Sequence, residues 1–253
     1  MTRLLYCMFQ FLNFYRTAVT KYQLHSPFVF VLSAVVLERH RWYYAFRDIE
    51  AMHDKMLKRD GVLLGFCSRL RSSTGKKLFR LVQWLNPGTV LQLGVSEGME
   101  SLYLLAGTGG LTRTLLLEES DEKAGKAQVK VDLMGFQDRV EIRVGDCGQT
   151  LPAALKALKK IDFVCIEAAE SPQKMVEYFE QCVPFAHETT VFAFTSAHRS
   201  AMSEAGWRAI KRHGRVTLTV DYFGISLVFI NPDFRVQQHF KVVASSWKVW
   251  KIL

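Results

Sequence analysis

Polar residues and glycines follow four short apolar runs of the chain, at the point where each run ends. If the runs are neighbouring parallel strands, these residues share one edge of a sheet, because the carboxyl ends of parallel strands open onto the same crevice. The residues are Gly94, Ser96 and Gly98 after the first run, Glu118 after the second, Asp146 with Cys147 after the third, and Glu167 after the fourth. Their convergence predicts a ligand site.

The first two of these runs end in residues suited to a nucleotide-like ligand. Gly94 permits a tight turn and Gly98 permits close approach of a backbone, and the helix that follows them offers free N–H groups and a positive dipole end. Glu118 could accept hydrogen bonds from ribose hydroxyls. Each feature also has a purely structural explanation, since glycines end many strands and carboxylates are favoured at helix starts.

The elements that must position these residues follow from hydrophobic periodicity. From residue 89 onward, short β-branched or leucine-rich runs alternate with helical segments, which is typical of βαβ units and a parallel sheet covered on both faces. The predicted strands are residues 90–93, 114–117, 140–144, 162–166 and 190–194. The predicted helices between and after them are residues 99–106, 122–134, 152–159, 172–182 and 197–213.

The alternation ends near residue 215. Residues 215–220 and 225–230 are two strands with too few residues between them for a helix, so they are expected to form an antiparallel hairpin. The predicted fold class is therefore α/β, with a seven-stranded sheet of five parallel strands plus an antiparallel strand pair.

The first 86 residues are predicted to be helical. An amphipathic helix opens the chain, Ser26 and Pro27 can start a second helix that runs to about residue 39, and residues 46–58 and 74–85 follow, with 60–73 as a loop. The domain prediction is a helical extension over 1–86, a ligand-binding domain over 87–243 and a tail over 244–253. The first helix is expected to pack on the main domain. Alternatively, it could contact a membrane surface, or a second copy of the chain in a homodimer.

Composition and charge narrow the class of protein. With 49% apolar and 23% charged residues, the chain is not disordered. The net charge is +9, and residues 1–90 carry 14 Lys and Arg against 5 Asp and Glu, whereas the remainder carries 19 against 19. The basic part could face an anionic substrate, a nucleic acid or a membrane, or form a solvated face.

Five cysteines without a CxxC or CxxH pair predict no disulfide framework and no zinc site. The apolar amino-terminal stretch is too short and too polar for a membrane span or a signal peptide. The expected location is the cytoplasm.

Five segments, in their order and spacing, resemble class I S-adenosylmethionine-dependent methyltransferases, and most of all a bacterial O-methyltransferase-like group. The segments are LQLGVSEGMESLYLLA, LLLEES, VGDCGQTLP, IDFVCIEAA and VDYFGISLVFI. KYQLHSPFVF, YYAFRDIEAM and TGKKLFRLVQWL are similar to the helical amino-terminal region of that group. The resemblance covers about residues 20–243 and implies a Rossmann-like methyltransferase sheet with S-adenosyl-L-methionine as cofactor.

The resemblance also assigns roles by position. It implies that Gly94, Ser96 and Gly98, with Gln92, hold the methionine end of the cofactor, that Glu118 holds the ribose, that Asp146 and Cys147 lie by the adenine, and that Glu167 lies beside the methyl group.

The chain departs from the family pattern at several of these positions. Gln92 stands where the family usually has an acid, and Glu100 stands where Ser or Thr is common. At the fifth strand end, Thr195-Ser196 replaces the Asp pair or Asp-Asn of relatives that bind a catalytic Mg²⁺ or Ca²⁺. Since Glu167 alone cannot supply a cluster of oxygen ligands, no catalytic metal is expected.

His198 is the titratable candidate near the fifth strand end. It could deprotonate an acceptor hydroxyl as a general base, together with Glu167 in the catalytic set, or it could be a solvent-facing residue at a helix start.

The resulting prediction is metal-independent O-methyl transfer to a small-molecule acceptor, which the basic part of the chain suggests is anionic. The alternative is a weak or inactive methyltransferase-like binding or scaffold protein. A nucleic-acid methyltransferase is disfavoured because no N-P-P-Y-type tetrapeptide follows the fourth strand, and a dinucleotide oxidoreductase because G-x-G-x-x-G is absent.

Overall fold

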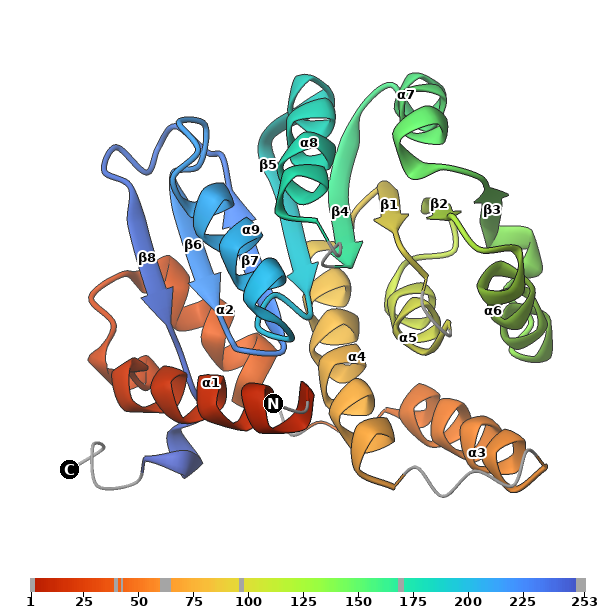
Figure 1. The fold of residues 1–253 in the computed structure, drawn as a ribbon, viewed down its shortest axis with the longest axis horizontal. Helices are drawn as coiled ribbons and strands as arrows, with labels where there is room; N and C mark the ends of the chain where they lie inside the picture. Colours follow the sequence, from red (N-terminus) through yellow and green to blue (C-terminus); the bar gives the residue numbers. More distant parts are fainter. Residues whose placement is uncertain are drawn as a thin grey trace.

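A computed structural model describes residues 3–38, 41, 43–59, 65–95, 98–167 and 171–248 of the chain. The strands are β1 (Thr89–Leu93), β2 (Arg113–Glu118), β3 (Val140–Val144), β4 (Ile161–Glu167), β5 (Ala186–Thr195), β6 (Leu218–Asp221), β7 (Ile225–Phe229) and β8 (Gln238–Lys241). They form one sheet in the order β3-β2-β1-β4-β5-β7-β6-β8 (Figure 1).

The helices are α1 (Arg3–Thr17), α2 (Pro27–Glu38), α3 (Tyr44–Arg59), α4 (Gly65–Leu85), α5 (Met99–Gly107), α6 (Asp121–Leu133), α7 (Cys147–Leu158), α8 (Pro172–Cys182) and α9 (Ala201–Lys211). Short 3₁₀ helices are η1 (Lys21–Gln23), η2 (Gln137–Arg139), η3 (Val183–Phe185) and η4 (Ser245–Trp247). In the described ranges, no helix is long and apolar enough to cross a membrane.

The predicted α/β fold class is confirmed. β1 to β5 pair in parallel, and β7 runs antiparallel to both β5 and β6. The predicted strand count of seven is wrong, because β8 adds an eighth strand in parallel with β6. The segment QHFK has no apolar run that periodicity could detect, and its strand conformation comes from pairing with the edge of β6.

Most residues of the inner strands β1, β2, β4 and β7 are buried, on both faces of the sheet, as the apolar runs predicted. Successive side chains of a strand point to opposite faces, so Val164 and Ile166 of β4 pack with α7, α8 and α9. Phe163 and Cys165 of the same strand pack on the other face with α2, α4 and α5. Figure 1 shows these two helical layers on either side of the sheet.

Helix α4 begins at Gly65, nine residues before the predicted start. The prediction of a loop up to residue 73 is therefore wrong for the first half of this helix. The stretch RLRSS at residues 69–73 suggested a loop. Gly75, inside the predicted helix, serves a packing role. A Cβ placed on Gly75 would lie 2.2 Å from the Tyr103 ring of α5, so the two helices pack closely because a side chain is missing there.

Two helix starts of the carboxyl-terminal part also differ from the prediction. Helix α7 begins at Cys147 rather than at residue 152, because the Asp146 side chain accepts a hydrogen bond from Gln149 N and caps the helix. Helix α9 begins at Ala201 rather than at residue 197, because Ser200 caps it by accepting from Ser203 N. His198 therefore lies in the turn before α9.

The end of α1 and the residues after it contact the end of β8 and the residues that follow that strand. Val19 N donates to Lys241 O, and Val243 N donates to Val19 O. Phe14 of α1 is buried in a cluster with Val243 and Phe223. The predicted packing of the first helix on the main domain is confirmed, whereas the domain division itself stays a prediction.

Candidate functional site

The turn after β1 forms one wall of the candidate site. Gly94 and Gly98 both have φ of +79°, a left-handed conformation in which a side chain is strained. A Cβ on Gly94 would lie 2.9 Å from Cβ of Glu167, and a Cβ on Gly98 would lie 2.9 Å from Cα of Ala127. Glycine is therefore required at both positions; Ser96 lies outside the described residues.

Glu118, at the end of β2, is buried against this turn with 4% of its surface exposed. Its Oε2 accepts a hydrogen bond from Val95 N at 2.8 Å, and its Oε1 accepts from Ser120 N at 3.1 Å. Each carboxylate oxygen has a second lone pair, so Glu118 can still accept hydrogen bonds from a ligand hydroxyl. The two amides hold the carboxylate in position.

Gln92 lies on β1 behind the same turn. Its Nε2 donates to Gly94 O at 3.0 Å, while its Oε1 is buried without a hydrogen-bond partner among the described residues. A buried acceptor without a partner costs about 1–3 kcal/mol. A ligand donor at this place, such as an ammonium group, would remove that cost.

Asp146 and Cys147 follow β3, and Cys147 lies near the carboxylates of Glu118 and Glu119. Asp146 caps α7 with one carboxylate oxygen. Burial raises the pKa of Cys147 to about 12, with the Glu119, Glu118 and Asp146 carboxylates adding to the effect. The Cys147 thiol therefore stays protonated and presents a neutral, weakly polar surface.

Helix α8 adds two residues that the sequence analysis missed. Tyr178 donates to Glu119 Oε1 at 3.2 Å, and Lys174 Nζ lies 3.5 Å from the same oxygen. Lys174 and Tyr178 are four residues apart, so they lie on the same face of α8. This spacing is visible in the sequence. They link α8 to the residue after Glu118.

Glu167, at the end of β4, is paired with a cation. Arg199 Nη1 lies 3.3 Å from Glu167 Oε1, and the Glu167 side chain lies against Gly94. Thr195 is the register partner of Glu167 on β5, and its hydroxyl is buried without a partner in the described part of the chain. Arg199 was not among the predicted site residues, although it is adjacent to His198 in sequence.

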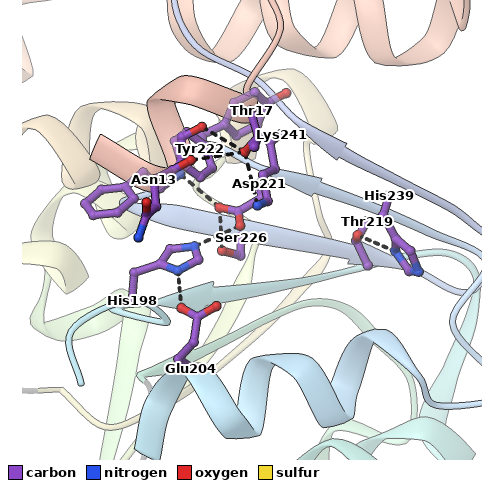
Figure 2. A network of polar contacts seen from close by, with 12 residues as sticks. Asn13, Thr17, His198, Glu204, Thr219, Asp221, Tyr222, Ser226, His239 and Lys241 are labelled. Atoms are coloured by element: carbon purple, nitrogen blue, oxygen red, sulfur yellow. Dashed lines mark hydrogen bonds and ion pairs between the residues drawn. The ribbon is translucent and has the colours of Figure 1, made fainter. Parts of the chain in front are cut away.

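His198 is not brought to this cluster. Its Nδ1 lies 2.5 Å from Glu204 Oε2 of α9, and its Nε2 lies 2.8 Å from Asp221 Oδ2 of β6 (Figure 2). The ring is 6% exposed and stacks on Phe223 with an interplanar angle of 3°. Both ring nitrogens are therefore occupied by carboxylates.

The electrostatics of His198 follow from these contacts. Burial by itself would lower the pKa of His198, but Asp221 and Glu204 outweigh it and raise the pKa to about 9. The pKa of Asp221 is lowered, because His198 and the donors Phe223 N and Ser226 Oγ outweigh the opposing effect of burial. Near neutral pH the ring is an imidazolium held between two carboxylates.

Two curated proteins and several solved structures are similar to this chain. No protein-family model matches the chain. It is 30% identical over 125 residues to a catechol O-methyltransferase of Mycobacterium tuberculosis (strain ATCC 25618 / H37Rv), which is 49% of this chain and 55% of that protein. It is 26% identical over 118 residues to a catechol O-methyltransferase of Niastella koreensis, 46% and 52% of the two chains. The chain thus spans about half the length of the curated relatives it matches.

Solved structures with the same fold cover more of the chain. Cofactor-bound Rv0187 from MTB superposes with a TM-score of 0.58 at 21% identity, over 82% of this chain and 99% of that one. The O-methyltransferase from Bacillus cereus in complex with SAH has a TM-score of 0.54 at 19% identity, over 79% and 95%. The chain has the Rossmann-like fold of these methyltransferases, which confirms the fold that the sequence resemblance implied.

Proposed function

We propose that the chain is an S-adenosylmethionine-dependent methyltransferase that methylates a hydroxyl oxygen of a small-molecule acceptor. The main support is the cluster at the carboxyl ends of β1, β2 and β4, where Gln92, Gly94, Glu118 and Glu167 meet. The names of the two relatives, and the structures of the same fold solved with SAM or SAH, agree with this proposal. They favour methyl transfer over the non-catalytic alternative.

The residues of the cluster fit the cofactor. The unpartnered Oε1 of Gln92 can accept a hydrogen bond from the methionine ammonium group. The Glu118 carboxylate, held by two backbone amides, can accept from the ribose hydroxyls. Cys147, with Asp146 at the start of α7, would line the adenine end with a neutral surface.

When bound, S-adenosylmethionine would supply a methyl group on a positively charged sulfur, which needs little further activation. The contribution of the chain is then positioning. Glu167, oriented by Arg199, would place negative charge beside that sulfur. A carboxylate already paired with a guanidinium is a poor ligand for a divalent cation, so we propose transfer without a catalytic metal.

We further propose that His198 positions structural elements rather than accepting the acceptor's proton. A general base needs a nitrogen that can take up a proton, and the Glu204 and Asp221 contacts occupy both nitrogens. The sequence-based assignment of His198 as a catalytic base is thus replaced by a structural role.

Calorimetric titration with S-adenosylmethionine tests the proposal. We expect saturable binding by the wild-type chain, and methylation of a catechol acceptor that continues in the presence of EDTA. Absence of binding at millimolar cofactor would overturn the proposal. Binding without turnover on any acceptor hydroxyl would support the scaffold alternative, and loss of turnover with EDTA would contradict the metal-independent mechanism.

The outward face of α1 is the candidate surface for the peripheral membrane contact that the sequence suggested. The outward face of this helix carries Leu5, Met8, Phe9 and Leu12, each more than half exposed, and exposed Arg16 follows in the same row. We propose that this face docks on an anionic membrane surface, since a cation next to an apolar row complements it. Sedimentation with anionic vesicles tests this, and a dimer in light scattering without vesicle binding would assign the face to a second copy instead.

The cytoplasm is the proposed location. It is supported by Cys7, Cys147, Cys165 and Cys182, which are all free thiols in the structure.

A further inference from the structure

A cavity of about 240 Å³ lies at the end of the sheet remote from β1 and β2. It is partly open to solvent and is lined by the end of α1, by β6 and β8, and by the last residue of α9. Asp221 and Lys241 are register partners on β6 and β8, as are Thr219 and His239, so all four lie on adjacent strands. Thr17 and Lys211 complete the polar lining.

Two lysines in this lining have no ion-pair partner within 4.0 Å among the residues that the structure describes. Lys241 Nζ donates to Thr17 Oγ1 at 3.3 Å, and Lys211 Nζ lies 5.8 Å from the centre of the Trp207 ring. The pKa of Lys211 is lowered by burial, and the nearby positive charges of Lys241 and Arg208 contribute, against the opposing effect of Asp221 and Glu204. The lysines are thus close enough to repel each other.

The carboxylate in the cavity lining, Asp221, makes its hydrogen bonds to residues other than the two lysines. Its Oδ2 faces His198 Nε2, and its Oδ1 accepts from Phe223 N and Ser226 Oγ. Figure 2 shows Lys241 and Thr17 on one side of Asp221, with His198 and Glu204 on the other. Asp221, Glu204 and the His198 imidazolium together carry one net negative charge, so the two lysines leave an excess of one positive charge.

His239 adds a donor. Burial and the proximity of Lys211 lower the pKa of His239, so its ring is neutral at physiological pH. Thr219 Oγ1 lies 2.8 Å from His239 Nδ1. When the hydroxyl donates to Nδ1, the ring carries its proton on Nε2 and can donate it to a ligand.

We propose that this cavity binds the phosphate or carboxylate group of a small anionic molecule. Lysine ammonium groups, hydroxyls and a neutral imidazole N–H all donate to oxyanion oxygens, and such charge-assisted hydrogen bonds are the strongest of their kind. The volume of about 240 Å³ is below the roughly 300–1,000 Å³ of pockets for drug-sized ligands. The ligand is therefore small, and the site is separate from the proposed cofactor site.

The test is calorimetric titration of the full chain with inorganic phosphate and, separately, with acetate, at constant ionic strength and without S-adenosylmethionine. We expect saturable binding of at least one anion, weakened about tenfold or more in the double variant Lys211→Met, Lys241→Met. The matched control is Lys123→Met, Lys156→Met, which removes the same charge from exposed positions on α6 and α7. This control should bind like the wild type.

A second measurement uses the wild type alone, in case the double variant does not fold. Phosphate should slow chemical acetylation of Lys211 and Lys241, read by mass spectrometry, and leave Lys123 and Lys156 unaffected. Stronger binding of phosphate than of acetate would identify the ligand group as a phosphate. Stronger binding of acetate would identify it as a carboxylate. Equal weakening in both double variants, no protection, or no saturable binding of either anion would overturn the proposal.

Discussion

The carboxyl edge of the sheet has two halves, and buried carboxylates have different partners in each half. At β1, β2 and β4, the acids Glu118 and Glu167 are held by backbone amides or by a partly exposed arginine, beside two glycines and an unpartnered Gln92 oxygen. At β5 and β6, Asp221 is held by the buried His198, which Glu204 contacts from α9. The carboxylates of the first half retain capacity to bind a ligand, whereas those of the second half are paired with His198.

This difference shows why residue type alone does not identify a catalytic group. Histidine at a strand end is a natural candidate base, yet the carboxylates of Asp221 and Glu204 raise the pKa of His198 and make it an internal cation. The buried ion pairs of His198 join the turn before α9, and α9 itself, to β6. Substitutions in the two halves should therefore affect different measurable quantities.

The largest expected effect is on stability in the second half. Asp221→Ala removes one partner of the buried pair and should lower the free energy of unfolding by about 3–5 kcal/mol. Urea denaturation measures this change. Asp138→Ala, at an exposed position of η2, should change it by less than about 0.5 kcal/mol; similar losses in both variants would refute the role of the pair.

Next in size is the pH dependence of stability from His198. Because its pKa is raised from 6.5 to about 9 on folding, the stabilisation is complete below pH 6.5 and is lost as pH rises through 9. The expected loss is about 3 kcal/mol. Denaturation curves from pH 6 to 10 measure it, and His198→Gln should remove this part of the pH dependence. A flat wild-type profile would contradict the assigned contacts.

Asp221 contributes at the acid end with the opposite sign. Its pKa is lowered from 3.8 in the folded state, so its stabilisation is present above pH 3.8 and is lost as pH falls below that value. Stability should therefore be greatest between these two transitions, and Asp221→Asn should weaken the acid transition.

In the first half, Glu118→Ala should act on ligand binding. Loss of hydrogen bonds to a charged acceptor costs about 1.5–3 kcal/mol, or roughly 10- to 150-fold in the dissociation constant of S-adenosylmethionine. Calorimetry measures it, with Glu188→Ala as the control, because Glu188 is exposed near the opposite edge of the sheet. Unchanged affinity in Glu118→Ala would remove Glu118 from the proposed site.

The smallest expected stability effect is that of Arg199→Met. Its pair with Glu167 is partly exposed, so the loss in unfolding free energy should be under about 1 kcal/mol. The positioning role predicts a lower kcat with a smaller change in KM for the acceptor, partly restored in Arg199→Lys. Arg215→Met, at an exposed position, serves as control; kinetics equal to the wild type would assign no role to Arg199.

The sequence by itself determined the order of strands and helices and the edge of the sheet at which the candidate site residues lie. Alternating apolar runs specified β1 to β7, because a strand buried on both faces must be apolar along its length. The placement of Gly94, Glu118 and Glu167 at one edge followed from parallel pairing alone. The individual roles by cofactor group came from family resemblance and stay predictions.

Tertiary structure decided what local patterns do not encode. The first half of α4 was predicted to be a loop, yet the helix begins at Gly65 and packs closely on α5 at Gly75. Strand β8 exists because the edge of β6 was available for pairing. The protonation of His198 depends on Glu204 and Asp221, six and 23 residues away. The cavity that joins Lys211 and Lys241 brings together the end of α9 and the last strand. Such contacts arise from folding the chain back on itself, and neither periodicity nor spacing records them.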